Sequence, residues 1–558
     1  MLRITGYSDK YSVCPGDNVK FYVNSEKNEN YSVDIVRLIH GDTNPDGPGF
    51  KEKIIRAACN KEYKGKNQKI HGGSYACVQP DHRMDVSSFT LQAFIFPTTP
   101  DKGVQGIITK WVGPKQSGFG MFIDENGCLA CWIGDGKGQV VKVSSGKPLL
   151  RKVWYMAAVS YDAKSKRVKV IQEPVVTPTN GGLGLSMLHP SSQTRGMISQ
   201  VVKVKPAMNN APLLMAANTK RLSSGRYVKG GHYKEALSEF PLPEQEAVYN
   251  GKIDRPRFSS AALDKHSIDA LARGFTTCPA ELRSLVIAAW DFHANISDNI
   301  ASCQIIDTSP NKLDGFVINL PVRGMTGFNW TSDDIVYHHA PNEYGAIHFH
   351  DDDIDDARWD ESFSYTIPKK LKSGVYGARL RIEGKESPET EDYVPFFVRP
   401  PAGTATAKVC FIVPTNSYLA YSNDNLATNS VVAELLAGRV PIMQASDLYL
   451  NEHREYGLST YSCHSDGSGV CYSTRLRPIL NMRPKYRHWL SPSLWQLNAD
   501  LHLTDWLEEK GIEYDVHTDE DLDREGVDLL NRYRVVLTGS HPEYSSENML
   551  VAYESYQQ

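Results

Sequence analysis

The chain has 558 residues, which is too long for one hydrophobic core and predicts roughly three or four domains. Hydrophobic residues make up 41% of the chain and charged residues 23%, a balance that excludes wholesale disorder. The 61 basic and 65 acidic residues nearly cancel, and the sequence has no long basic run. This charge pattern argues against a nucleic-acid partner.

The sequence has no segment typical of export or membrane insertion. Residues 1–13 lack the continuous apolar region of a signal peptide, and no stretch of about 18 apolar residues occurs. We therefore expect a cytoplasmic protein without membrane association. Ten cysteines at this low density are expected to be reduced thiols rather than a disulfide framework.

From about residue 1 to residue 400 the sequence consists of short alternating runs bounded by turn residues. In residues 88–96, for example, Phe89, Leu91 and Ala93 alternate with residues that would face the other way. Such runs predict antiparallel sheets with one buried face. Further strands are expected at residues 106–110, 118–123, 128–133, 154–161 and 167–172, the last two as a hairpin.

The order of these strands resembles a laminin-G or concanavalin-type jelly roll, which we assign to residues 59–325. Strand-like runs on either side, in residues 1–58 and 326–400, predict a small immunoglobulin-like β-sandwich that the jelly roll interrupts. The jelly-roll fold occurs both in carbohydrate-binding modules and in structural domains. It therefore does not settle the function.

A different pattern begins after the proline-rich linker that starts at Arg399. Residues 408–413 form a continuous apolar run, as expected for a parallel strand that is covered on both faces. Residues 499–510 have helical spacing, and strands are expected at 512–517 and 533–538. This β-α-β order predicts a doubly wound α/β domain over residues 408–558. So few strands cannot cover its core, so we expect the sequence to be truncated at the C-terminus.

Polar segments follow the first and third of these predicted strands. Residues 414–424 include Tyr421, and residues 539–544 include His541 and Glu543. Between them lies a long Gly- and Ser-rich segment, residues 457–478. Ligands of an open parallel sheet bind beyond the carboxyl ends of its strands, so we expect these segments to form the functional site.

At these three segments the chain resembles the large subunit of N,N-dimethylformamidase, because the first-strand, Asp-Gly-Ser-Gly and His-Pro-Glu-Tyr motifs occur in the same order. The resemblance implies an amidotransferase-like domain with one Fe(III) ion held by Tyr421, Tyr461 and Glu543. It places His541 beside these ligands or in catalysis, and Tyr456 stays open as an alternative to Tyr461. It also implies assembly with a small alpha subunit into a higher hetero-oligomer.

The residue types agree with this chemistry. Phenolate and carboxylate oxygens are hard donors, which suit Fe(III) better than copper or zinc. Such an ion would polarise an amide carbonyl and activate water, while His541 would transfer a proton. The expected function is therefore hydrolysis of N,N-dimethylformamide to formate and dimethylamine, or of a related small amide.

Other interpretations stay open at this stage. The jelly roll could bind glycan beside a non-catalytic C-terminal domain, or the same metal site could cleave another amide. A tyrosine more often packs as an aromatic side chain than binds metal, and His541 and Glu543 could cap the helix that follows them. A second acidic segment, residues 348–356, mixes metal-ligand types but is expected to be a solvated loop.

Overall fold

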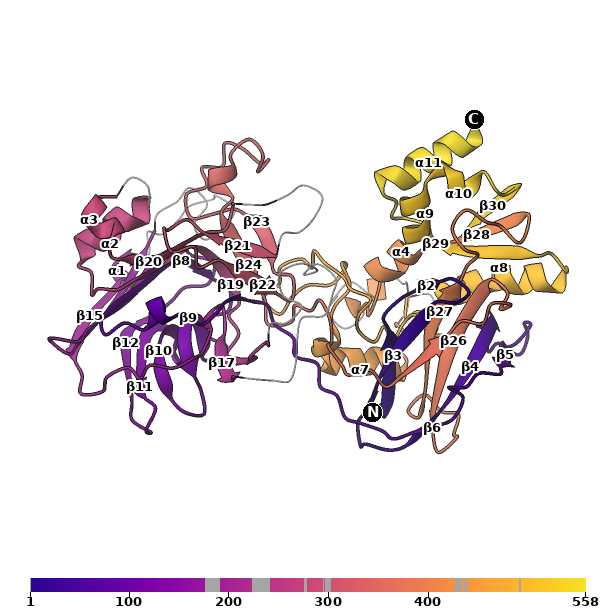
Figure 1. Cartoon of the computed structure of the whole chain (residues 1–558), viewed down its shortest axis with the longest axis horizontal. Coiled ribbons are helices and arrows are strands. Elements are labelled where there is room, and N and C mark those ends of the chain that lie inside the picture. Colours follow the sequence, from indigo (N-terminus) through magenta and orange to yellow (C-terminus); the bar gives the residue numbers. More distant parts are fainter. Residues whose placement is uncertain are drawn as a thin grey trace. The chain divides into compact units, whose positions relative to one another are not determined.

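The structure is a computed structural model, which is mostly β with few helices (Figure 1). It divides into two compact units. We call Met1–Ile70 with Asp355–Gln558 the terminal unit, and His71–Ile354 the inserted unit. None of the helices in the described ranges is both long and apolar enough to cross a membrane. The structure describes residues 2–175, 191–222, 241–274, 278–294, 296, 303–426, 434, 435, 438, 440–490 and 493–558.

The inserted unit consists of two mainly antiparallel sheets packed face to face (Figure 1). One sheet has the strand order β12-β11-β10-β9-β16-β7-β22-β21. The other has the order β15-β14-β13-β8-β19-β24-β23, and β20 pairs with both β19 and β21 and so links the two. Two further strands, β17 and β18, pair with each other, and β17 also pairs with β9.

The elements of the inserted unit have the following bounds. The strands are β7 (Tyr75–Val78), β8 (Phe89–Pro97), β9 (Gln105–Val112), β10 (Ser117–Ile123), β11 (Cys128–Asp135), β12 (Val140–Pro148), β13 (Tyr155–Asp162), β14 (Arg167–Pro174), β15 (Gly196–Val201), β16 (Leu213–Met215), β17 (Asn218–Arg221), β18 (Glu244–Glu246), β19 (Gly251–Ser259), β20 (Val286–Asp291), β21 (Gln304–Asp307), β22 (Gly315–Ile318), β23 (Val322–Met325) and β24 (Ala346–Phe349). The helices are η1 (His82–Met84), α1 (Ser191–Thr194), α2 (Lys265–Arg273), α3 (Ala280–Arg283) and η3 (Pro341–Glu343).

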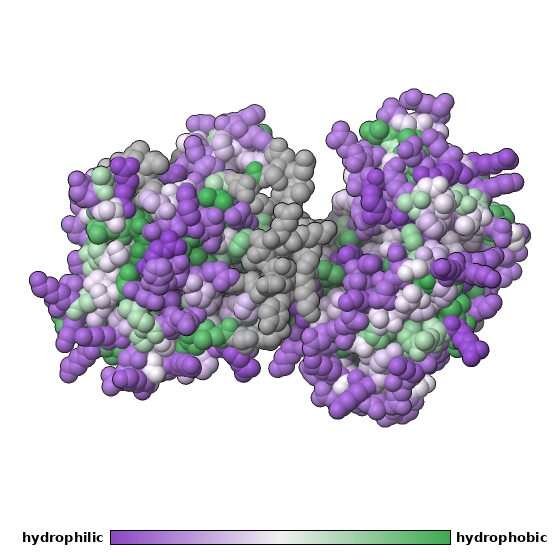
Figure 2. All heavy atoms as spheres, viewed as in Figure 1, coloured by the Kyte–Doolittle hydropathy of each residue, from purple (hydrophilic) through white to green (hydrophobic). Residues whose placement is uncertain are grey.

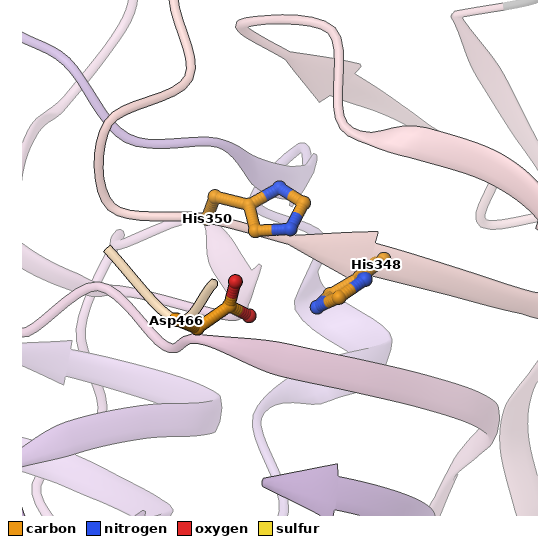
Figure 3. A group of neighbouring side chains, drawn as sticks. All are labelled: His348, His350 and Asp466. Atoms are coloured by element: carbon orange, nitrogen blue, oxygen red, sulfur yellow. The ribbon is translucent and has the colours of Figure 1, made fainter. Parts of the chain in front are cut away.

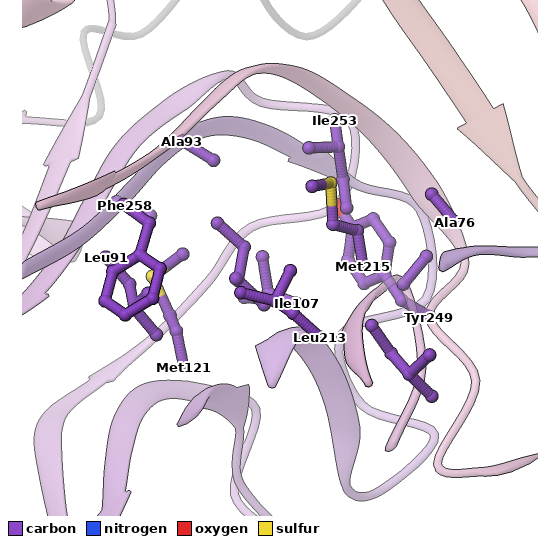
Figure 4. Close-up of a cluster of buried hydrophobic side chains, with 14 of the residues drawn as sticks. Ala76, Leu91, Ala93, Ile107, Met121, Leu213, Met215, Tyr249, Ile253 and Phe258 are labelled. Atoms are coloured by element: carbon purple, nitrogen blue, oxygen red, sulfur yellow. The ribbon is translucent and has the colours of Figure 1, made fainter. Parts of the chain in front are cut away.

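Alternation along the strands builds the core between these two sheets. Leu91 and Ala93 of β8 point into the same space as Met121 of β10 and Phe258 of β19 (Figure 4). Successive side chains of a strand face opposite sides, so every second residue of β8 joins this core. The hairpin expected from the sequence is present, because β13 and β14 pair in register from Tyr155 with Pro174 onward.

In the terminal unit, strands from before and after the inserted unit share two sheets. One sheet has the order β1-β3-β25, and the other has the order β2-β27-β26-β4-β5 with β6 on β4. Their bounds are β1 (Ile4–Ser8), β2 (Ser12–Val13), β3 (Asn18–Ser25), β4 (Tyr31–His40), β5 (Lys51–Ile55), β6 (Glu62–Tyr63), β25 (Phe363–Thr366), β26 (Gly374–Ile382) and β27 (Glu391–Val398). Apolar side chains of both sheets pack into one core. The face of the molecule in Figure 2 is largely hydrophilic, as burial of the apolar strand faces requires.

The rest of the terminal unit is an α/β layer with a parallel three-stranded sheet in the order β29-β28-β30. The central strand is covered on both faces. Phe411 and Val413 pack with α8 and the β-sandwich, whereas Cys410 and Ile412 pack with α9, α10 and α11. The bounds are β28 (Val409–Val413), α4 (Thr415–Ala420), α7 (Ala445–Glu452), η4 (Arg454–Tyr456), α8 (Leu497–Glu509), β29 (Tyr514–Thr518), α9 (Asp519–Glu525), α10 (Val527–Leu530), β30 (Val535–Thr538) and α11 (Glu547–Gln557).

Truncation of Phe258 tests the core of the inserted unit. Its ring is fully buried and lies 5.8 Å from that of Phe119, centroid to centroid. We expect Phe258→Ala to lower the free energy of unfolding of this unit by about 3–5 kcal/mol, because a cavity replaces a packed ring. The matched control Met197→Ala, at a half-exposed position on β15, should change it by less than about 0.5 kcal/mol. Urea unfolding followed by tryptophan fluorescence measures both, and equal losses would contradict the assignment of the core.

Candidate metal centre

The site begins where β28 passes into the short helix α4, at the carboxyl edge of the parallel sheet. Tyr421 is the residue that ends α4, and its N–H donates to the carbonyl oxygen of Ser417 at 3.1 Å. The side-chain amide of Asn481 donates to the carbonyl oxygen of Tyr421 at 2.7 Å. These two hydrogen bonds fix the backbone from which the Tyr421 side chain leaves.

Tyr461 reaches the same place from the Gly- and Ser-rich segment. The N–H and the hydroxyl of Thr460 both donate to the carbonyl oxygen of Ala420, each at 3.0 Å. This tie holds Tyr461 next to Tyr421, and their rings stack with centroids 4.3 Å apart and planes inclined by 10°. The last turn of α4 thus positions both tyrosines.

The third segment, which follows β30, is anchored on the same helix. The N–H of Glu543 donates to the hydroxyl oxygen of Ser417 at 2.9 Å. Nearer β30, the N–H of Ser540 donates to the carboxylate of Asp500, a buried residue of α8. A Cβ atom at Gly539 would lie 2.4 Å from this carboxylate, so only glycine fits there without displacing it.

The oxygen atoms of three side chains, Tyr421, Tyr461 and Glu543, meet where these segments converge. The Tyr421 hydroxyl donates to Oε2 of Glu543 at 2.6 Å and lies 2.9 Å from the Tyr461 hydroxyl. The Tyr461 hydroxyl donates to Oε1 of Glu543 at 3.0 Å. Oxygen ligands of one ion, each bonded at about 2 Å in an octahedral shell, are neighbours at roughly 3 Å. The donor set and its spacing therefore fit a single hard cation.

His541 and one aromatic ring border this oxygen cluster. Nε2 of His541 lies 3.0 Å from Oε2 of Glu543, and both side chains are 38% exposed, so the cluster is open to solvent. The Trp495 ring lies 5.1 Å from the His541 ring and stands edge-on to Tyr421 at 5.6 Å, centroid to centroid. Trp495 therefore gives the site an apolar wall.

The protonation of the cluster follows from its contacts. The hydrogen bond from Tyr421, together with those from Tyr461 and His541, holds the pKa of Glu543 below its usual range. Partial burial and the hydrogen bonds to Glu543 raise the pKa of Tyr421 to about 12, and burial with the Tyr421 contact does the same for Tyr461. Without a cation, both phenols keep their protons at neutral pH. A cation that binds both oxygens as phenolates must displace two protons.

The structure brings the four predicted residues together, namely Tyr421, Tyr461, Glu543 and His541. Tyr456, which the sequence left as an alternative to Tyr461, lies elsewhere. It is buried, and its hydroxyl lies 3.2 Å from that of Thr5 and 3.4 Å from that of Tyr449. The geometry thus places Tyr461 in the cluster, and metal binding by these residues stays a prediction.

Sequence reasoning missed three residues of the site. Ser417 anchors the Glu543 segment, Trp495 forms the apolar wall, and the hydroxyl of Tyr544 contacts that of Tyr461. Tyr544 follows Glu543 directly in the His-Pro-Glu-Tyr motif, so its place in the sequence was a usable signal. Ser417 and Trp495 carry no such signal.

The Asp-Gly-Ser-Gly motif forms a tight turn. The N–H of Ser468 donates to the side chain of Asp466 at 2.9 Å, and Gly467 has a φ of +84°, which favours glycine. The serine is thus part of a local turn.

The expectation of a solvated loop at residues 348–356 is wrong, because this segment is buried. His348 and His350 lie at the end of β24 with ring centroids 4.0 Å apart (Figure 3). Nδ1 of His350 lies 3.2 Å from the carboxylate of Asp353, which also accepts a hydrogen bond from the Ser74 hydroxyl at 2.6 Å. These polar partners compensate for the loss of solvent within the inserted unit.

Two segments of the chain match models of known protein families. Residues 322–558 match the family model described as "N,N-dimethylformamidase beta subunit-like, C-terminal", and residues 71–171 match that of the "Concanavalin A-like lectin/glucanases superfamily". The second match confirms the laminin-G or concanavalin-like prediction for the inserted unit. A putative carbohydrate-binding protein from Bacteroides ovatus is only 13% identical, with a TM-score of 0.24 over 56% of this chain and 95% of that one, and supports no argument.

Two relatives match the whole chain. It is 39% identical over 565 residues to the N,N-dimethylformamidase beta subunit of an Alcaligenes species. It is also 39% identical over 561 residues to the protein of the same name from Paracoccus aminophilus. Each alignment covers 100% of this chain and 70% of the relative.

The anchoring role of Ser417 can be tested by removing its hydroxyl. Its oxygen accepts from the N–H groups of Glu543 and Tyr544, so Ser417→Ala leaves two partly buried donors without a partner. We expect the free energy of unfolding of the terminal unit to fall by about 1–3 kcal/mol in urea titrations. The control Ser364→Ala removes a hydroxyl from an exposed position of β25 in the same unit and should have little effect. Equal stability of the two variants would argue against the anchor.

Proposed function

This chain belongs to the N,N-dimethylformamidase beta-subunit family, and on that premise we propose that it hydrolyses the C–N bond of a small amide. Because both relatives are named N,N-dimethylformamidase beta subunit, N,N-dimethylformamide is the first candidate substrate. Its hydrolysis would give formate and dimethylamine. The observation that carries the proposal is the set of three contacts, 2.6–3.0 Å long, that join the Tyr421 oxygen, the Tyr461 oxygen and the Glu543 carboxylate in pairs.

In this proposal the three oxygens hold one Fe(III) ion. Two phenolates and one carboxylate are a hard and strongly negative donor set, which matches a trivalent ion better than soft metals. When bound, the ion supplies a Lewis acid that polarises the amide carbonyl. The exposed side of the cluster, next to His541, leaves room for substrate and water.

His541 is the group that moves protons in this proposal. When its Nε2–H donates to Glu543, Nδ1 is the nitrogen that is free to accept a proton. Nδ1 takes a proton from the attacking water and later gives it to the nitrogen of the departing amine. One water is consumed and one amide bond is broken, which yields the acid and the amine. The Trp495 ring contacts the apolar substituents of the amide and limits the access of bulk water.

The proposal extends to assembly. Both relatives are named as beta subunits, which supports a complex of this chain with a small alpha subunit and further association into a hetero-oligomer. Such a complex is the form in which activity is best measured.

Carbohydrate binding is a second candidate, and one feature of the inserted unit favours it. A groove of about 640 Å³ lies over the outer face of β9 and β11, where it combines Trp111 and Trp132 with the polar side chains of Gln116, Asn218 and Glu246. Aromatic walls with a few polar groups are typical of small-molecule sites. This function would not need the oxygen cluster, so the two candidates are separable.

Tyr421→Phe in the complete protein tests the metal site. We expect the wild-type protein to contain one iron per chain and to show a phenolate-to-iron charge-transfer band in the visible spectrum. The variant lacks one of the three oxygens, so its iron content and its band should both fall strongly. The control Tyr456→Phe removes a buried hydroxyl outside the cluster and should leave both unchanged.

Two other results would count against the metal proposal. A folded wild-type protein that hydrolyses amides without iron and without the band would refute the metal proposal. A protein with neither iron nor amidase activity would leave sugar binding at the groove as the better-supported function.

His541→Asn tests proton transfer. Asparagine keeps a polar side chain but cannot take up a proton at neutral pH, so we expect dimethylamine release to slow by about 10²–10⁴-fold. Iron content should stay at the wild-type level because the three oxygens are untouched. Unchanged turnover at full iron loading would remove His541 from the mechanism.

A further inference from the structure

The two tyrosines of the oxygen cluster have different surroundings. The Tyr421 oxygen contacts two other oxygens, those of Tyr461 and Glu543. The Tyr461 oxygen contacts the Tyr421 oxygen and the other carboxylate oxygen of Glu543, and it also contacts the hydroxyl of Tyr544. The Tyr461 oxygen therefore has one neighbour more than the Tyr421 oxygen, and this neighbour is the hydroxyl of the residue that follows Glu543.

The Tyr544 hydroxyl does not belong to the group formed by the oxygens of Tyr421, Tyr461 and Glu543. Among the described residues, the hydrogen bonds of its hydroxyl involve the Tyr461 oxygen and neither the Glu543 carboxylate nor the Tyr421 oxygen. A fourth ligand of the same octahedral shell would lie about 3 Å from two of the three donors, whereas the Tyr544 hydroxyl contacts one of them. The Tyr544 hydroxyl is therefore placed to act on Tyr461 rather than on the ion.

Two hydrogen bonds link the backbone of Tyr544 to α4. Its N–H donates to the Ser417 hydroxyl oxygen at 3.4 Å, and its carbonyl oxygen accepts from the side-chain amide of Asn416 at 3.3 Å. Both anchors belong to α4, the helix that also ends in Tyr421. The contact between Tyr544 and Tyr461 is thus supported by the same helix as the cluster.

We propose that Tyr544 is a positioning residue whose hydroxyl donates a hydrogen bond to the oxygen of Tyr461 while that oxygen binds the ion. This inference rests on the proposed metal site. A Tyr461 oxygen that binds the ion as a phenolate has no hydrogen to donate, so in the contact between the two oxygens the Tyr544 hydroxyl is the donor. Hydrogen bonds to a charged oxygen are stronger than those between neutral groups, which favours this arrangement.

The consequence is that the two phenolates are unequal donors. A hydrogen bond withdraws electron density from the Tyr461 oxygen, so Tyr461 gives less charge to the ion than Tyr421 does. The ion then stays a stronger electron acceptor toward the amide carbonyl. The same hydrogen bond lowers the energy of the filled phenolate orbitals, which moves the charge-transfer band of Tyr461 to shorter wavelength.

Tyr544→Phe in the complete, iron-loaded protein tests this inference. The ring is kept and only the hydroxyl is lost, so we expect full iron content and a charge-transfer band displaced to longer wavelength. In the wild-type protein, resonance Raman spectra should resolve two C–O stretching modes from the unequal tyrosinates, and this measurement does not depend on how the variant folds. The matched control is Tyr556→Phe, which removes from α11 a hydroxyl that donates to the Tyr533 carbonyl oxygen.

Three outcomes would overturn the inference. An unmoved band at full iron content would show that Tyr544 does not act on Tyr461. Loss of iron would make Tyr544 a ligand rather than a positioning residue. An equal displacement in Tyr556→Phe would make the effect unspecific. Absence of iron and of the band from the wild-type protein is a different failure, because it removes the proposed metal site and this inference together.

Discussion

The passage from β28 into α4 is the constraint on which the candidate site depends. Within one short helix, the Ser417 hydroxyl holds the Glu543 segment, the Ala420 carbonyl holds the Tyr461 segment, and Tyr421 itself supplies an oxygen. The three oxygen donors are separated by 40, 82 and 122 residues in pairs along the chain. Bringing such distant segments together costs chain entropy, and the hydrogen bonds of α4 and the packing of β28 offset this cost.

The residues that support the site are buried, whereas two side chains of the site itself are exposed. Thr415, Ser417 and Tyr418 of α4 are buried, and Tyr418 donates to Asp500, which also holds the loop after β30. Burial raises the pKa of Asp500 above its usual range, while the hydrogen bonds from Tyr418 and Ser540 to its carboxylate oppose this shift. By contrast, the side chains of His541 and Glu543 are more than one-third exposed. A buried support beneath exposed reactive groups is the arrangement that a binding site for small molecules requires.

The candidate site lies within one of the two units of the chain. The four side chains that the sequence predicted for the candidate site come from the terminal unit, whereas the inserted unit has its own large core and its own groove. The matched relatives extend beyond this chain, which spans 70% of their length. Tyr421, Tyr461 and Glu543 meet within the described residues.

The sequence by itself determined the strands of both sheet types and the three polar segments of the site, because side-chain alternation and strand ends are local properties. It could not choose between Tyr456 and Tyr461, since their loop has no periodicity, and only the bonds of Thr460 to Ala420 decide the register. It also missed the Tyr461 to Tyr544 contact, which joins residues 83 positions apart. The segment around His350 is buried because a carboxylate and the distant Ser74 satisfy it. Contacts between distant residues leave no periodic trace in a single sequence, so only the tertiary structure decides them.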